Sequence, residues 1–532
     1  MKNLSLVVCS VIMFSITGCK TSATMAQTKV VSNKETSEDK LYRPNFHFTP
    51  QKGWMNDPNG MFYANGTYHL FYQYYPSDIV WGPMHWGHAI SKDLIKWEEQ
   101  PIAIYPDNDK YIFSGSAVVD VNNTSGLGKG KNAPIIAIYT LHDMTKEKES
   151  KIDVEQQDIA FSNDNGVTWQ KFDEGNPVIK NPGIRDFRDP KVTWDATHKQ
   201  WIMALAAQDV NRFYRSSDLK TWEYLSDFGK NIGAHGGVWE CPDFFEIKVK
   251  GTKETKWVLI QSLNPGGANG GSGTQYFIGD FDGKTFTLDS NFAKTVEAEK
   301  AVWLDYGKDN YAGVTWNNIP VADGRKLFIG WMSNWDYAQV VPTTTWRSSM
   351  TIPREIQLIK KGNDYSLISN PVSEINKYVS KTTSKKSLKA KESLSLLEGE
   401  KIDLTQAIVE FNVKNLKQDT YNIILSNKAG ESLKFGINNK ENYLFIDRSK
   451  AGKIDFSEKF AATISKASLN ENQKEVTFKI ILDKTSIEIF YNNGEKAMTE
   501  IFFLTTPFTE ITATSNQDIE ISDLKINQLK LN

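Results

Sequence analysis

The chain has 532 residues, with 62 Lys and Arg against 64 Asp and Glu, so its formal net charge at pH 7 is only −2. This length predicts roughly two to four domains. Because basic and acidic residues are almost equal in number, the charge gives no reason to expect nucleic acid or an acidic polymer as a partner. Aromatic residues make up 12% of the chain, including 15 Trp. They slightly favour a sugar ligand, because flat rings suit sugars, although they also fill β-rich cores.

Residues 1–19 predict a lipoprotein signal peptide. Lys2 is followed by an apolar run at residues 4–16 that is too short to span a bilayer. The stretch ITGC that ends at Cys19 resembles a bacterial lipobox, which implies lipidation of Cys19. Residues 20–40 are polar, lack aromatics and predict a disordered tether. We therefore expect an exported lipoprotein that touches the membrane only through its lipid anchor. The absence of acidic residues directly after Cys19 favours the periplasm over the cell surface.

Cys241 is the one cysteine outside this signal, because Cys9 and Cys19 both lie in it. A single cysteine cannot form an intrachain disulfide, and Cys241 has no Cys or His neighbour at metal-ligand spacing. His85 and His88 in HWGH would point to opposite faces of a strand. The sequence therefore predicts no metal site and no cofactor.

All 15 Trp lie between Trp54 and Trp346, so a domain boundary is expected after this region. Within it, SKDLIKW (residues 91–97), SNDNGVTW (162–169) and SSDLKTW (216–222) share the order Ser, Asp, Trp. Ser-x-Asp predicts a side-chain-stabilised hairpin turn, and the Trp packs the returning strand. Recurrence at roughly 50 to 70 residues is the scale of propeller blades, which residues 41–354 are predicted to form, in preference to a sandwich array.

The region after the last Trp divides into two parts. Residues 355–400 are rich in Lys and Ser, as in KTTSKKSLKAKESLSL, and predict a linker region. Residues 401–532 contain short alternating segments such as IVEFNVKNL, YNIILS and VTFKIILDK, separated by Asn, Gly and Lys. This pattern predicts an antiparallel β-sandwich.

Three carboxylates lie beside rigid or bulky residues next to apolar strands. They are Asp57 in WMNDPNG, Asp189 in DFRDPKV and Glu240 in HGGVWECPDFF. Taken alone, Asp57 also fits an Asx-type turn that caps its own backbone. Because a propeller gathers its innermost strands around one axis, carboxylates from different blades can share a pocket.

The same motifs resemble the three signature blocks of glycoside hydrolase family 32, which contains the invertases, inulinases and levanases. Other stretches match in the family's order, including YHLFYQYYP, WGPMHWGHAISKDL, IFSGSAVV and IGWMSNWDYA. The resemblance covers about residues 43–354, continues more weakly through the tail, and is closest to exo-acting bacterial levanases. It implies an all-β fold, a five-bladed β-propeller followed by a C-terminal β-sandwich, and hydrolysis of β-fructosidic bonds with retention.

The resemblance also implies a role for each carboxylate: Asp57 is the nucleophile, Glu240 the general acid/base and Asp189 the transition-state stabiliser. Retaining chemistry needs an ionised nucleophile and a protonated acid, and a third carboxylate helps to orient an oxocarbenium-like ring. Positions that match the terminal-fructose subsite are Asn56, Gln73, Trp81, Ser114 and Arg188. Further candidates for aromatic walls, with core packing as the alternative for each, are Trp54, Trp303 and Trp335.

The expected partner is a β-fructan, and levan, inulin and sucrose all stay open as substrates. One alternative is an endo-acting levanase, and another is a fructosyltransferase that passes the same covalent intermediate to a sugar. A fructan-binding propeller without activity is disfavoured because all three carboxylates are present. The sequence does not indicate the oligomeric state.

Overall fold

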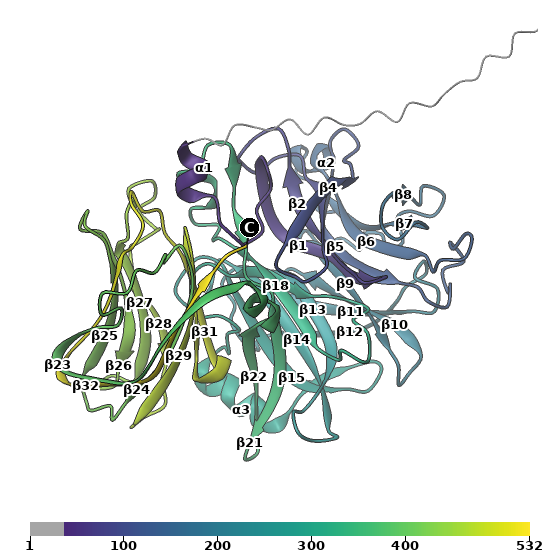
Figure 1. Ribbon diagram of the computed structural model, residues 1–532. Coiled ribbons are helices and arrows are strands. Elements are labelled where there is room, and N and C mark those ends of the chain that lie inside the picture. Colours follow the sequence, from purple (N-terminus) through teal and green to yellow (C-terminus); the bar gives the residue numbers. More distant parts are fainter. Residues whose placement is uncertain (1–36, 532) are drawn as a thin grey trace, which may run out of the picture.

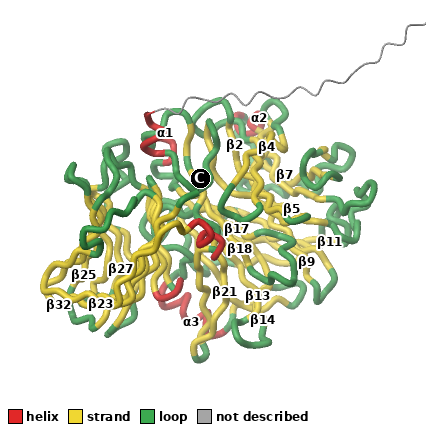
Figure 2. The backbone as a smooth tube through the Cα atoms, viewed as in Figure 1, coloured by secondary structure: helices red, strands yellow, loops and turns green. Residues whose placement is uncertain are grey.

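The computed structural model describes residues 37–531, in which strands far outnumber helices (Figure 2). Five mainly antiparallel sheets form the blades of a propeller, and a ten-stranded sheet forms a sandwich beside it (Figure 1). The predicted five-bladed propeller with a C-terminal sandwich is therefore confirmed. Within the described residues, no helix has the length and apolar character needed to cross a bilayer.

The first four blades each take four consecutive strands of the chain. Blade one contains β1 (Gly53–Ala64), β2 (Thr67–Tyr75), β3 (His85–Ser91) and β4 (Trp97–Ile104). Blade two contains β5 (Lys110–Val119), β6 (Ile135–Asp143), β7 (Glu155–Ser162) and β8 (Gln170–Lys171). Blade three contains β9 (Phe187–Asp195), β10 (Gln200–Ala207), β11 (Val210–Ser216) and β12 (Glu223–Phe228). Blade four contains β13 (Val238–Lys248), β14 (Thr255–Asn264), β15 (Gly273–Phe281) and β16 (Phe286–Leu288).

Blade five is interrupted by a connection that closes the ring. Its strands are β17 (Tyr311–Thr315), β18 (Lys326–Met332), β21 (Arg354–Lys361) and β22 (Asp364–Pro371). Between β18 and β21, the short strand β19 (Trp346–Arg347) pairs in parallel with β1, and β20 (Ser349–Met350) pairs with β18. The chain thus leaves blade five, adds a strand to blade one and returns, which ties the last blade to the first.

The Ser-Asp-Trp repeats form the predicted hairpins between the third and fourth strands of the first three blades. In the first repeat, the Ser91 hydroxyl accepts the backbone N–H of Leu94 at 2.8 Å. The Trp97 indole N–H donates to the Leu94 carbonyl at 3.0 Å. The repeats that begin at Ser162 and Ser216 make the corresponding turn contacts.

The predicted linker over residues 355–400 is wrong. Strands β21 and β22 lie in this region and complete blade five, so the propeller continues to Pro371 instead of ending at residue 354. The Lys- and Ser-rich part is β23 (Val379–Ser395), a strand that is exposed along most of its length. Lysine is common on exposed edge strands because its charge prevents pairing with other chains, so its abundance here does not indicate a linker.

The sandwich is built around the long strand β32. Its strands are β23, β24 (Gln406–Lys414), β25 (Thr420–Ser426), β26 (Ser432–Asn438), β27 (Tyr443–Lys450), β28 (Ser465–Ser468), β29 (Glu475–Asp483), β30 (Ser486–Tyr491), β31 (Lys496–Ile501) and β32 (Glu510–Leu529). One edge of β32 pairs with β23, while the other pairs first with β25 and then with β24. The sheet therefore divides along β32 into two layers.

Three short α-helices and three 3₁₀ turns complete the described chain. They are α1 (Ser37–Tyr42), α2 (Met144–Lys148), α3 (Ser290–Glu299), η1 (Ala338–Val340), η2 (Ser373–Tyr378) and η3 (Asn492–Gly494). Helix α1 overlaps the tether predicted for residues 20–40, so that prediction is wrong for its last four residues. The helix is held in place because Glu38 accepts the backbone N–H of Thr344 at 2.6 Å and Tyr42 packs edge-on against Phe503. The predicted signal, Cys19 and the rest of the tether lie outside the described residues.

Buried ion pairs join the propeller to the sandwich. His47 contacts Asp483 through Nδ1 and Glu488 through Nε2, both at 2.8 Å. Arg354 of β21 also donates to Glu488 and bridges it to Asp305 at 2.8 Å. Burial alone lowers the pKa of His47, but its two carboxylate partners outweigh burial and raise it to about 9.

The free energy of unfolding should therefore decrease at alkaline pH. The pKa of His47 is raised by folding, so its stabilisation is complete below about pH 6.5 and is lost as pH rises through about 9, an effect of about 3 kcal/mol. Denaturant unfolding curves at several pH values measure this loss. The control is His47→Gln, which has no titrating ring, and an equal pH dependence in both proteins would contradict the prediction.

Candidate active site

The innermost strand of every blade contains a β-bulge. The paired positions on either side of each bulge are Met55 and Pro58 in β1, Ile112 and Gly115 in β5, Arg188 and Lys191 in β9, Glu240 and Asp243 in β13, and Tyr311 and Val314 in β17. Each innermost strand has one residue more than its neighbour at this point. A bulge breaks the ladder and re-aims side chains, so functional residues can turn away from the regular alternation of the strand.

A pocket of about 440 Å³ lies at the bulges of blades one to four, and Asp57, Asp189 and Glu240 all line it. The three carboxylates come from blades one, three and four, as the separation of their motifs predicts. Trp81, Phe113 and Trp335 add aromatic surface to the lining. Neutral polar ligands with an apolar face, such as sugars, fit a pocket of this composition.

Asp57 is held by donors on both of its oxygens. The Asn56 side chain donates to Oδ1 at 3.0 Å, and the Ser114 hydroxyl donates to Oδ2 at 2.8 Å. Asn56 is itself fixed, because its Oδ1 accepts the indole N–H of Trp54 at 2.8 Å. Hydrogen bonds to both oxygens of a carboxylate restrict its orientation.

Cys241 links Asp57 to Asp189. Its Sγ lies 3.3 Å from Oδ2 of Asp57 and 3.5 Å from Oδ2 of Asp189, and its backbone N–H donates to the same Asp189 oxygen at 2.9 Å. Both Asp189 and Cys241 have positive φ angles, 65° and 46°. Such backbone conformations are unfavourable for residues with a side chain and are concentrated at functional sites.

Glu240 is contacted from both neighbouring blades. Arg188 donates to its Oε1 through Nε at 3.3 Å and through Nη2 at 3.1 Å, while the Tyr311 hydroxyl donates to its Oε2. Arg188, Glu240 and Tyr311 occupy the same position before the bulge of blades three, four and five. The repeated geometry of the propeller therefore aligns these three side chains.

Burial shifts the pKa values of two of the three carboxyl groups upward. Burial raises the pKa of Asp189 to about 8, against the opposing charge of Arg188 and with added repulsion from Asp57 and Glu240. Burial also raises the pKa of Glu240, although Arg188 and the hydrogen bond from Tyr311 oppose it. A group that keeps its proton near neutral pH can act as a general acid.

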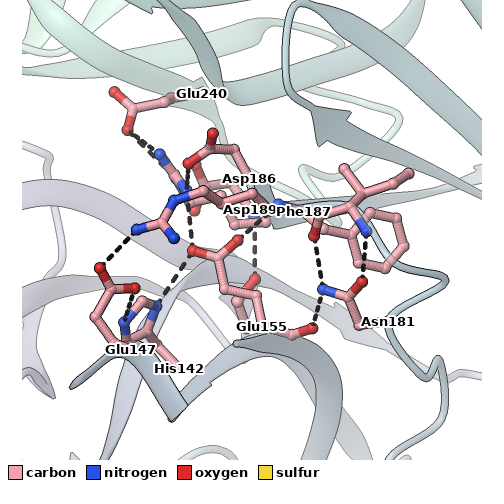
Figure 3. A network of polar contacts seen from close by, with 12 residues as sticks. His142, Glu147, Glu155, Asn181, Asp186, Phe187, Asp189 and Glu240 are labelled. Carbon is pink, nitrogen blue, oxygen red and sulfur yellow. Dashed lines mark hydrogen bonds and ion pairs between the residues drawn. The ribbon is translucent and has the colours of Figure 1, made fainter. Parts of the chain in front are cut away.

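Glu155, Asp186 and His142 form a polar network beside the pocket (Figure 3), and this network holds Arg188 in place. Its Nη1 contacts Glu155 at 2.9 Å and Asp186 at 2.8 Å. Glu155 also accepts the backbone N–H of Phe187 at 2.6 Å and contacts His142 at 3.2 Å. Burial alone raises the pKa of Glu155, but Arg188 and these contacts outweigh it and hold that pKa below its ordinary value.

Two family models cover most of the chain. The model described as the Glycosyl hydrolases family 32 N-terminal domain matches residues 47–371, and the Glycosyl hydrolases family 32 C terminal model matches residues 374–528. The chain belongs to glycosyl hydrolase family 32. It is therefore a glycoside hydrolase, and the boundary between the matches agrees with the end of β22.

Individual relatives resemble this family 32 enzyme over most of its length. A levanase of Bacillus subtilis (strain 168) is 44% identical over 92% of this chain and 71% of that protein. The extracellular exo-inulinase inuE of Aspergillus niger is 38% identical over 87% of this chain and 90% of that protein. A crystal structure of exo-inulinase from Aspergillus awamori has a TM-score of 0.83 at 34% identity, covering 93% of this chain and 99% of that chain.

Most of the predicted binding residues lie in the pocket of this family 32 enzyme. Besides the three carboxylates, the lining includes Asn56, Gln73, Trp81, Ser114, Arg188 and Trp335. The structure places two others elsewhere. Trp54 is fully buried behind Asn56 and stacks on Trp335, so it supports the wall without forming it. Trp303 packs between the cores of blade four and the sandwich, where its contacts are those of a core residue.

Four residues of the site were not among the predicted site residues: His142 and Glu155 line the pocket, while Tyr311 and Cys241 contact its carboxylates. The fold alone brings Glu155 to His142 and Arg188, Tyr311 to Glu240, and the thiol of Cys241 to Asp57 and Asp189. Their one common feature is position, since each lies at or near one end of a strand. Among residues 37–531, no cluster of three or more His, Cys, Asp or Glu has an arrangement that could hold a metal ion.

Proposed function

We propose that this family 32 enzyme releases fructose, one unit at a time, from the non-reducing ends of β-fructans, with levan as the first candidate substrate. The observation that carries the proposal is the meeting of Asp57, Asp189 and Glu240, from three blades, in one pocket with aromatic walls. Support comes from similarity to proteins named levanase and exo-inulinase. Inulin and sucrose are further candidates because they present the same terminal fructosyl unit.

The proposed reaction has two steps. Glu240 protonates the glycosidic oxygen while the Asp57 carboxylate attacks C2, so the leaving sugar departs and a fructosyl-enzyme ester forms. Glu240, now ionised, then removes a proton from water as the water attacks C2 and displaces Asp57. Two inversions at the same carbon give net retention. Asp189 binds ring hydroxyls and stabilises the oxocarbenium-like transition state.

The terminal fructose is proposed to lie among Asn56, Gln73, Trp81, Ser114 and Arg188. Gln73 provides the clearest support. Its side-chain nitrogen is buried in the pocket lining and has no hydrogen-bond partner among the described residues. A buried donor without a partner is destabilising, and a sugar hydroxyl would satisfy it.

An early time course on levan tests the exo mode of action. Fructose alone is expected from the first minutes, because contacts around a single terminal ring recognise a chain end. The products are separated by size, and parallel reactions with inulin and sucrose rank the three substrates. A ladder of intermediate oligosaccharides would instead identify an endo-acting enzyme, and products longer than the substrate would identify a fructosyltransferase. Binding of levan without any product would support the non-catalytic alternative.

We also propose that the enzyme is exported and anchored by a lipid on Cys19, facing the periplasm. The support is the apolar run before ITGC. The Cys19→Ala form is expected to move from the membrane fraction to the soluble fraction after cell lysis. A form that still partitions wholly with membranes excludes a lipid anchor at this residue.

A further inference from the structure

An exposed ion pair lies in the pocket lining beyond the three carboxylates. Nη2 of Arg185 contacts Oε1 of Glu147 at 2.7 Å, and both residues line the pocket. Their side chains are 48% and 31% exposed. Exposed ion pairs contribute little to stability, so the folded state gains little from placing this one at the pocket.

The pair is held on rigid supports. Glu147 lies on α2, where Asp143 caps the helix by accepting the N–H groups of Thr145 and Lys146 at 3.0 and 3.1 Å. Arg185 follows a turn in which Asn181 accepts the N–H groups of Gly183 and Ile184, each at 2.8 Å. These capped turns fix the backbones from which the two side chains extend.

A chain of contacts connects Glu147 of this pair, through His142 and Glu155, to the residues around Glu240 (Figure 3). His142 lies between Glu147, at 3.7 Å, and Glu155, at 3.2 Å, and its ring stacks on Phe113. Glu155 in turn contacts Arg188, which contacts Glu240. The pair therefore lines the same pocket as Glu240 and Arg188 and is linked to them through His142 and Glu155.

The position of Glu240 defines where the leaving sugar must lie. If Glu240 protonates the glycosidic oxygen, the sugar bonded to that oxygen extends past Glu240, away from the terminal fructose. We propose that Arg185 and Glu147 bind this leaving sugar. The guanidinium donates to one hydroxyl and the carboxylate accepts from its neighbour, which is the donor and acceptor pattern that a vicinal diol requires. This inference rests on the proposed function and assigns the residues that recognise the second fructosyl unit of a fructan.

Two substrates with different leaving groups test whether Arg185 and Glu147 bind the leaving sugar. One is a β-2,6-linked difructoside, whose leaving group is fructose, and the other is p-nitrophenyl β-fructofuranoside, whose leaving group has no sugar hydroxyls. For Arg185→Gln and for Glu147→Gln, the ratio of kcat/KM on the difructoside to kcat/KM on the aryl fructoside should fall by about 10- to 100-fold. The rate on the aryl fructoside also reports whether each variant is folded.

Arg215→Gln is the matched control. Arg215 pairs with Glu223 at 2.8 Å with side chains 47% and 63% exposed, and neither residue lines the pocket. For Arg215→Gln, the ratio of kcat/KM on the difructoside to kcat/KM on the aryl fructoside should equal that of the unmodified enzyme. A ratio that stays constant in Arg185→Gln and Glu147→Gln overturns the inference, whether the two rates fall together or remain unchanged. Failure of the unmodified enzyme to cleave the difructoside would instead refute the proposed function.

Discussion

Replacing Asp57 with alanine is expected to lower kcat on levan by at least about 10⁴-fold, because no covalent intermediate can form without the nucleophile. The fold should persist. Asp57 is only partly buried, and its partners Asn56 and Ser114 remain in well-packed strands. The apparent Tm of the variant should therefore stay within about 3 °C of that of the unmodified enzyme.

Azide separates a nucleophile from other essential residues. In Asp57→Ala the small cavity admits azide, which attacks C2 directly, so the product is a fructosyl azide of inverted configuration. The configuration can be read by nuclear magnetic resonance. A product of retained configuration, or residual activity within about 100-fold of the unmodified enzyme, would show that another group is the nucleophile.

Replacing Glu240 with alanine is expected to have an effect that depends on the leaving group. On levan the fructose leaving group needs a proton, and loss of the acid should lower kcat/KM by about 10³-fold or more. A nitrophenolate leaves without protonation, so formation of the fructosyl enzyme from p-nitrophenyl β-fructofuranoside should fall much less. The second step also loses its base, and a burst of nitrophenol followed by slow turnover is expected.

The same variant gives the complementary azide result. Asp57 still forms the ester in Glu240→Ala, and azide needs no general base, so it should accelerate turnover and give a product of retained configuration. Glu240→Gln is the control for shape, because it keeps the contacts with Arg188 and Tyr311 but supplies no acid. Equal losses on levan and on the aryl fructoside would contradict the role of Glu240 as the acid.

A proline follows each of the three carboxylates within two residues, which helps to explain why their positions could be predicted. Asp57 precedes Pro58, Asp189 precedes Pro190, and Pro242 separates Cys241 from Asp243. Proline cannot donate to a strand ladder, so in a central strand it is expected only at a bulge or other break in the ladder. These prolines are therefore a sequence signal for three of the five bulges.

The supporting residues could not be predicted in the same way. Glu155 lies in a strand with no unusual neighbour, and only pairing between blades brings it to Arg188 and His142. The positions of Trp54 and Trp335 relative to the pocket could not be predicted from the sequence either. Both are tryptophans in matching motifs, but one lines the pocket and the other is buried behind it. Burial on one side of a strand depends on packing partners that are distant in the sequence.

The misassigned region after residue 354 has a different cause. The outer strands of blade five come after the last Trp in the sequence. The end of the propeller predicted from composition, residue 354, therefore lies 17 residues before its end in the structure, Pro371. Composition reports where aromatic side chains are dense. It does not report where hydrogen-bonded sheets end.

The ion pairs between propeller and sandwich limit how this chain can be recombined with its relatives. Arg354 and His47 depend on Glu488, and Asp309 depends on Arg448, with each partner supplied by the other domain. A buried charge that loses its partner is strongly destabilising. An exchange of the C-terminal half between relatives must therefore carry the matching charges with it. Although two family models divide the sequence, the two halves are expected to be inherited as a single unit.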